Sequence, residues 1–254
     1  MKKGLLAVLL LAACAQAPSE PQPSLAEAQN AEAAGRAKAH NELGASYYER
    51  GQYAIALEEL KTAIAADPSY GPAYNTTGLV YMELNEDAAA EKNFQQALRL
   101  NGQDSEAHNN YGHFLCSRAR PAEGIAHFQT AIKDPLYPTP QKALANAGMC
   151  SRKLNDEKAA EAYFAKALKI EPWNAVALFH LADIAFKHGQ FDEARNHLAR
   201  QHQVAAPSPE SLWLAVRIER KLGDRNAEAS YGLQLRKNFP ASPEAKALLD
   251  RRYE

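Results

Sequence analysis

The stretch Asn-Thr-Thr-Gly-Leu-Val-Tyr occupies residues 75–81, and Ala-Glu-Lys-Asn-Phe-Gln-Gln-Ala follows at residues 90–97. Similar stretches stand at residues 41–47 and at residues 109–115, equally spaced before and after the first one. Each of the three has a glycine at its fourth place. A fixed period with several matching places indicates stacked copies of one structural unit, each of which buries its apolar face on its neighbours.

Counting from the start of the unit, most copies have glycine or alanine at positions 8 and 20, phenylalanine or leucine at 24, and alanine at 27. This pattern matches the tetratricopeptide signature, in which each unit of about 34 residues is a helix A, a turn and a helix B. We therefore predict an all-α, right-handed superhelical solenoid of six repeats, at residues 37–70, 71–104, 105–140, 141–174, 175–208 and 209–242. A last amphipathic segment, residues 243–254, is predicted to be the capping helix.

The turns between helices A and B contain Gly51, Gly189 and Gly223 in three repeats, which favours a glycine cap at the end of helix A. The regular period breaks once, because the interval from Gly112 to Gly148 is longer than the interval from Gly78 to Gly112. The two extra residues fall in the segment 134–140, which contains three prolines. This insertion either adjusts the packing of two repeats or contacts a partner.

The N-terminus has the pattern of a secretory leader: two lysines, then an apolar run at residues 4–13 that is too short to span a membrane. The sequence Leu-Ala-Ala-Cys at residues 11–14 resembles the lipobox of bacterial lipoproteins. The resemblance implies a signal peptide at 1–13, a lipid on Cys14 and, since Ala15 is not aspartate, the outer membrane. The alternative is an ordinary signal peptide with an incidental cysteine.

Residues 14–36 are rich in Ala, Gln, Glu, Ser and Pro. Such a composition cannot bury enough apolar area to order itself, so we predict a flexible tether. Its later part, within residues 25–38, could instead extend the first helix.

Cys116 and Cys150 fall on the A helices of repeats 3 and 4, which lie side by side in such a solenoid. An exported chain meets an oxidising compartment, where a disulfide between them is allowed. Two small buried thiols are the alternative.

The sequence contains none of the common catalytic motifs, so we expect no enzyme, cofactor or metal site. The formal net charge of −1 does not suggest a nucleic-acid partner. A protein-binding surface is the remaining interpretation, with no small-molecule substrate.

In tetratricopeptide folds the concave face is lined by positions 2, 5, 9 and 12 of the A helices. Asparagine recurs at position 5 in the first three repeats. From these positions we select as candidate groove residues Asn41, Ala45, Tyr48, Asn75, Leu79, Met82, Asn109 and His113. Asparagine can bind a peptide backbone as donor and acceptor, or it can serve the packing of the repeats alone. Because this groove has no cluster of Lys and Arg, an apolar or extended partner segment fits better than a terminal carboxylate.

The run from Asn109 to Cys116, the segment Tyr-Pro-Thr-Pro at 137–140 and the run from Asn146 to Cys150 are the most distinctive parts of the chain. Together with the lipobox and six repeats, they resemble the type IV pilus biogenesis and stability lipoproteins called PilF or PilW. The resemblance implies a pilotin-like protein on the outer membrane that binds the secretin subunit and promotes its multimerisation. The alternative is a lipoprotein adaptor for peptidoglycan or other envelope machinery.

Overall fold

The computed structural model describes residues 24–253. Within this range the regular structure is entirely helical. The helices are α1 (Leu25–Glu49), α2 (Tyr53–Ala66), α3 (Gly71–Glu83), α4 (Asp87–Leu100), α5 (Ser105–Ser117), α6 (Pro121–Lys133), α7 (Pro140–Lys153), α8 (Glu157–Ile170), α9 (Ala175–Lys187), α10 (Phe191–Val204), α11 (Pro209–Leu222), α12 (Arg225–Asn238) and α13 (Pro243–Leu249).

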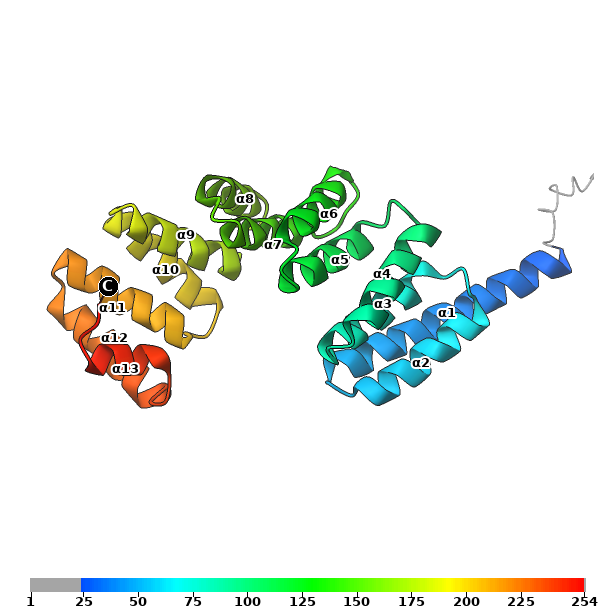
Figure 1. The fold of residues 1–254 in the computed structure, drawn as a ribbon, viewed down its shortest axis with the longest axis horizontal. Coiled ribbons are helices and arrows are strands. Elements are labelled where there is room, and N and C mark those ends of the chain that lie inside the picture. Colours follow the sequence, from blue (N-terminus) through cyan, green and yellow to red (C-terminus); the bar gives the residue numbers. More distant parts are fainter. Residues whose placement is uncertain (1–23, 254) are drawn as a thin grey trace, which may run out of the picture.

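Odd-numbered and even-numbered helices from α1 to α12 are the A and B helices of six successive repeats. Each A helix packs on its own B helix and on the A helix of the next repeat. Figure 1 shows the pairs following one another in a bowed row from α1 and α2 to α11 and α12, with α13 at the end. The predicted tetratricopeptide solenoid is confirmed.

Every A–B turn contains one residue in the left-handed region of backbone space. These residues occupy position 15 of each repeat: Gly51 (φ 71°), Asn85 (59°), Ala119 (59°), Asn155 (59°), Gly189 (76°) and Gly223 (79°). The three glycine turns expected from the sequence are present. Asparagine tolerates this conformation, whereas alanine pays a steric cost for it.

Close packing within a repeat depends on the residue at position 8. A Cβ atom added to Gly78 would lie 2.8 Å from the ring of Phe94, a distance that real Cβ atoms essentially never show. Repeat 6 reverses this pairing, with Val216 at position 8 and Gly232 at position 24. Gly232 leaves room for Leu248 of α13, which is the neighbour nearest to its Cβ position.

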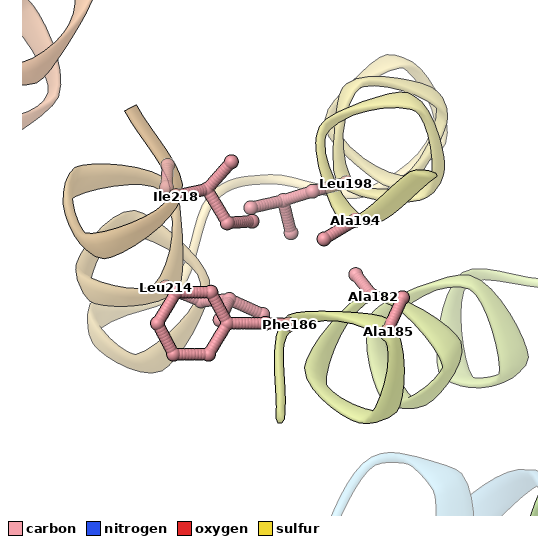
Figure 2. Close-up of a cluster of buried hydrophobic side chains, with 8 residues drawn as sticks. Ala182, Ala185, Phe186, Ala194, Leu198, Leu214 and Ile218 are labelled. Carbon is pink, nitrogen blue, oxygen red and sulfur yellow. The ribbon is translucent and has the colours of Figure 1, made fainter. Parts of the chain in front are cut away.

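The core is a row of small clusters, each shared by neighbouring helices. Figure 2 shows one of them, in which Phe186 of α9 and Leu198 of α10 both point toward α11, the helix that carries Leu214. The three side chains are at most 8% exposed. Each repeat therefore completes its core only with the help of the next repeat.

The expected tether at residues 14–36 is wrong from residue 25 onward, because α1 begins at Leu25. The Ser24 hydroxyl accepts a hydrogen bond from the Glu27 backbone, and the Glu27 carboxylate accepts one from the Ser24 backbone, which forms a capping box. Alanine and glutamate are good helix formers, and a helix can form on the surface without burying apolar area. Leu25 is accordingly 85% exposed. The predicted signal peptide, Cys14 and the rest of the expected tether lie outside the described residues.

The capping helix is shorter than the predicted 243–254, since α13 ends at Leu249. Ala245 on α13 is buried and packs with Leu212 and Leu235, so this helix covers the end of repeat 6. Arg251 has a φ of 55°, a left-handed conformation that ends the helix and turns the chain back. Among residues 24–253, no helix is both long and apolar enough to cross a membrane.

The proline-rich insertion packs into the junction of repeats 3 and 4. Asp134 accepts hydrogen bonds from the Leu136 backbone and from the Ser105 hydroxyl. Tyr137 is 5% exposed and lies in one cluster with Cys116 and Cys150. This contact supports the interpretation that the insertion adjusts the packing of two repeats.

Candidate protein-binding groove

The residues predicted to line the groove lie on three neighbouring helices, α1, α3 and α5. We call the surface formed by positions 2, 5, 9 and 12 of the A helices the concave face. Because α1 packs on α3, and α3 packs on α5, the predicted residues belong to one continuous strip of the solenoid. Their accessibility to a partner differs from one residue to the next.

Asn75 and Asn109 are used within the protein. Asn75 is 7% exposed and accepts a hydrogen bond of 3.3 Å from Asn110, while Asn109 is 5% exposed and accepts one of 3.0 Å from Asn146. Asn109 also donates to Asn110 at 3.3 Å. These bonds form a chain across α3, α5 and α7, which agrees with the structural alternative for these two asparagines.

Asn41 and Ala45 of α1 are half-buried, and Asn41 does not join this chain. Its Oδ1 atom is buried and has no hydrogen-bond partner among the described residues. An unsatisfied buried acceptor costs stability. Asn41 therefore differs from Asn75 and Asn109, the asparagines at position 5 of the next two repeats.

Tyr48 and Leu79 provide the accessible apolar surface of repeats 1 and 2. Both are half-buried, and Tyr48 lies beside Tyr53 with a ring-centroid distance of 6.1 Å. Burial raises the pKa of Tyr48, and the negative charge of Glu83 raises it further. Met82 is different from both, because it is 8% exposed and packs in a core cluster with Phe94. It supports the groove from beneath.

His113 has an exposed side chain on α5. Loss of solvent around the ring lowers the pKa of His113, and the positive charge of Lys153 lowers it further. The negative charge of Glu83 has the opposite, smaller effect. The imidazole is therefore neutral at neutral pH. In that form it offers a partner one hydrogen-bond donor and one acceptor.

Cys116 and Cys150 form a disulfide in the structure, with their Cα atoms 5.9 Å apart. The bond joins α5 to α7, and the Nζ atom of Lys153 donates a 2.9 Å hydrogen bond to the carbonyl of Cys116. Both sulfur-bearing residues are at most 5% exposed. The disulfide thus fixes the two A helices that flank the proline-rich insertion.

Sequence reasoning missed the asparagines at position 6, Asn110 and Asn146, which complete the hydrogen-bonded chain. The adjacent pair of asparagines in repeat 3 was the available signal. It also missed a cavity of about 370 Å³ between α2, α3 and α4, lined in part by Leu57, Thr77 and Tyr81. Among the described residues, no group of three or more His, Cys, Asp or Glu side chains could hold a metal ion.

Comparison with known proteins agrees with the repeat fold. Models of the tetratricopeptide repeat match residues 75–139 and 152–213, and a further repeat model matches residues 44–85. Repeats of this kind are typical of scaffolds and adaptors that bind other proteins.

Two relatives cover most of the chain. The type IV pilus assembly protein PilF of Pseudomonas aeruginosa is 30% identical over 206 residues, which are 81% of this chain and 82% of PilF. A solved structure of Pseudomonas aeruginosa PilF superposes with a TM-score of 0.82 at 28% identity, over 87% of this chain and 99% of that one. The crystal structure of PilW, described as a widely conserved type IV pilus biogenesis factor, gives a TM-score of 0.75 at 33% identity, over 84% and 98%.

The repeat architecture, the extent of these matches and the level of identity lead to one assignment. The chain belongs to the type IV pilus biogenesis tetratricopeptide proteins of the PilF and PilW kind.

Proposed function

We propose that this chain is a pilotin of the type IV pilus: a lipoprotein that binds the secretin subunit and promotes its localisation and multimerisation in the outer membrane. Membership of the PilF and PilW family is the observation that carries the proposal. The lipobox at residues 11–14 supports a lipid anchor on Cys14 and a periplasmic position at the outer membrane.

The shape of α1 supports a contact on the first two repeats. A helix rises 1.5 Å per residue, so the part of α1 before repeat 1, residues 25–36, is a rigid arm roughly 18 Å long. A lipid on Cys14 would hold this arm, and with it repeats 1 and 2, nearest to the membrane. A secretin subunit bound there stays close to the bilayer in which it assembles.

The chemistry of the groove supports a partner segment that is extended and largely apolar. Tyr48 and Leu79 are half-buried and can cover apolar side chains of the partner, while His113 offers both a donor and an acceptor. Several copies tethered to one membrane raise the local concentration of bound secretin subunits without any new contact.

A double substitution, Tyr48→Glu with Leu79→Glu, tests the proposal. A charge at each half-buried site opposes an apolar partner, since the carboxylate loses water on binding. We expect the heat-stable secretin multimers of the outer-membrane fraction to fall strongly, while the purified variant keeps its helical circular dichroism. Met82→Glu is unsuitable because a buried charge would damage the fold.

The matched control is Leu233→Glu, which introduces the same charge at a leucine of α12 that is 59% exposed. It should leave the multimers at the wild-type level. Wild-type multimer levels in a folded Tyr48→Glu, Leu79→Glu variant would refute the groove assignment. A deletion strain with altered cell shape but normal pili and multimers would refute the pilotin proposal as a whole.

A further inference from the structure

The last described residues of the chain fold back onto repeat 6. After α13 the backbone of Arg251 donates to the carbonyl of Leu248 at 3.2 Å, and the backbone of Arg252 donates to the carbonyl of Ala247 at 2.9 Å. These two bonds and the left-handed φ of Arg251 end the helix and direct the chain toward α11. We call residues 250–253 the C-terminal tail.

Tyr253 of the tail is held by three side chains of α11. Its ring stacks on Trp213 with a centroid distance of 5.6 Å and an interplanar angle of 23°. The guanidinium of Arg220 lies over the same ring, 3.9 Å from its centroid. The Nε atom of Arg217 donates a 3.0 Å hydrogen bond to the Tyr253 carbonyl.

Trp213, Arg217 and Arg220 are positions 5, 9 and 12 of repeat 6. These positions define the concave face, and in repeat 2 they are occupied by the candidate groove residues. The tail therefore occupies, within its own chain, the place where a bound peptide would lie. It shows that this repeat can hold an aromatic side chain and an adjacent backbone carbonyl.

A cavity lined by positively charged side chains adjoins the tail. Its volume is about 710 Å³, and its lining residues are Arg217, Arg220, Lys221, Arg251, Arg252 and Tyr253. Within residues 24–253, Arg220 pairs with Glu228 and Arg252 pairs with Asp250, each at 3.0 Å, and the other three cations of the cavity form no ion pair. Glu254 lies outside the described residues. Counted over the described residues, the cavity has excess positive charge, unlike the groove of repeats 1 and 2.

The packing beneath this cavity holds its cations in place. The guanidinium of Arg217 lies 4.4 Å from the ring centroid of Phe186, the side chain that Figure 2 shows between α9 and α11. Stacking on an aromatic ring restricts an arginine side chain, so less conformational entropy is lost when it binds an anion.

We propose that the concave face of repeat 6 is a second peptide-binding site, specific for an acidic segment that carries an aromatic side chain. Trp213 and Arg220 take the aromatic side chain by stacking and cation–π contact. Arg217, Lys221 and Arg251 bind the carboxylates. In the free chain Tyr253 fills the aromatic subsite, so its ring competes with the partner's aromatic side chain while Arg251 keeps its place beside the cavity.

A peptide suits this site better than an anionic membrane surface. The cations surround a cavity on the inner, concave side of the repeat, and the aromatic subsite already holds a tyrosine of the tail. A flat bilayer surface reaches neither feature. The site is independent of the pilotin contact on repeats 1 and 2, so either proposal can fail alone.

The test uses the purified full chain and a fluorescein-labelled peptide, Asp-Glu-Tyr-Asp-Glu-Tyr, in fluorescence anisotropy at low and physiological salt. We expect binding that weakens with salt and is absent for the neutral peptide Asn-Gln-Tyr-Asn-Gln-Tyr. Lys221→Glu with Arg251→Glu should weaken binding at least ~10-fold, because two charge-assisted contacts become repulsive. The control is Lys166→Glu with Lys169→Glu, two exposed lysines of α8 reversed in the same way, which should leave binding unchanged.

Tyr253→Ala separates the site from its internal competitor. It should tighten binding of the acidic peptide several-fold, since the aromatic subsite becomes free while the cations remain. Equal binding of acidic and neutral peptides by both wild type and Tyr253→Ala would overturn the proposal. So would binding of phosphatidylglycerol vesicles through Lys221 and Arg251 without binding of the peptide, because the ligand would then be a membrane.

Discussion

Gly148→Ala is expected to destabilise the protein although alanine is the better helix former. Gly148 lies within α7, and a Cβ atom there would be 2.6 Å from Cε1 of Phe164, 2.7 Å from its Cζ and 2.8 Å from its Cδ1. All three atoms belong to one rigid ring that is 0% exposed. The ring cannot swing away as the end of a flexible side chain could.

Two opposing effects set the size of the change. Alanine in place of glycine inside a helix gains about 1 kcal/mol of stability. Forcing an extra methyl group into a packed core costs about 1–3 kcal/mol. Since the Cβ would meet three ring atoms at once, the upper part of that range applies, and we expect a net loss of about 1–2 kcal/mol.

The matched control is Gly35→Ala in α1. Gly35 is also a helical glycine, but its added Cβ would have no atom within 4 Å. Only the helix-propensity gain then remains, so this variant should melt at or above the wild-type temperature. Both variants are compared with wild type by thermal unfolding, followed by circular dichroism. If Gly148→Ala melts at or above the wild-type temperature, close approach at position 8 is not what holds the two helices together.

Three further predictions concern covalent, backbone and titration effects. The double variant Cys116→Ala, Cys150→Ala should lower the free energy of unfolding by about 4 kcal/mol in the chain-entropy model, because the disulfide links residues with a sequence separation of 34. Equal urea midpoints for this variant and the oxidised wild type would contradict the prediction. Ala119→Gly should raise the urea midpoint, because glycine adopts the left-handed backbone of this turn without a steric clash, and the expected gain in stability is about 0.5–1 kcal/mol. A lower midpoint would show that alanine has no steric cost at this turn. Burial and the charge of Arg152 lower the pKa of His180 from 6.5 to about 4. As the pH drops, His180 is therefore protonated in the unfolded chain before it is protonated in the folded one, and stability should fall between pH 6.5 and about 4. His180→Asn should flatten that part of a stability–pH curve measured by urea unfolding, and an unchanged curve would refute the attribution.

The fold was predictable because the sequence repeats its packing constraints. Glycine at position 8 faces a large side chain at position 24, and this pair recurs at a constant spacing in the first repeats. Repeat 6 was still recognisable from Gly223 in its turn, although Val216 and Gly232 exchange the large and small positions. The turn at Ala119 could not have been predicted from its residue type, because the neighbouring helices impose its left-handed backbone.

The ends of the solenoid were predicted less well, for two physical reasons. Composition indicates whether a segment can bury apolar area, and it says less about whether a surface helix forms, which is why the helix from Leu25 was only an alternative. The course of the tail depends on contacts with α11, which no local pattern encodes. Tyr253 and Trp213 are distant in the sequence, and only the fold brings them together.

The positions of the candidate groove residues on the A helices were predictable from the sequence, but their accessibility was not. The 3.6-residue period assigns Asn75 and Met82 to the same helix face as Leu79. Whether each side chain remains free depends on the following repeat: an asparagine of α5 bonds to Asn75, and residues of α4 and α5 cover Met82. Tyr48 and Leu79 retain exposed surface and remain the proposed contact.

The contact between repeats 1 and 2 and the secretin is the central claim, and in-cell photo-crosslinking tests it most directly. The crosslinker p-benzoylphenylalanine would replace Tyr48 in one strain, Leu79 in a second and Leu233 in a third. Irradiation should join the chain to the secretin subunit from the first two positions and give no such product from the third, which lies on α12. Secretin adducts from Leu233 alone, or from none of the three in cells that assemble pili, would contradict the assignment of this groove.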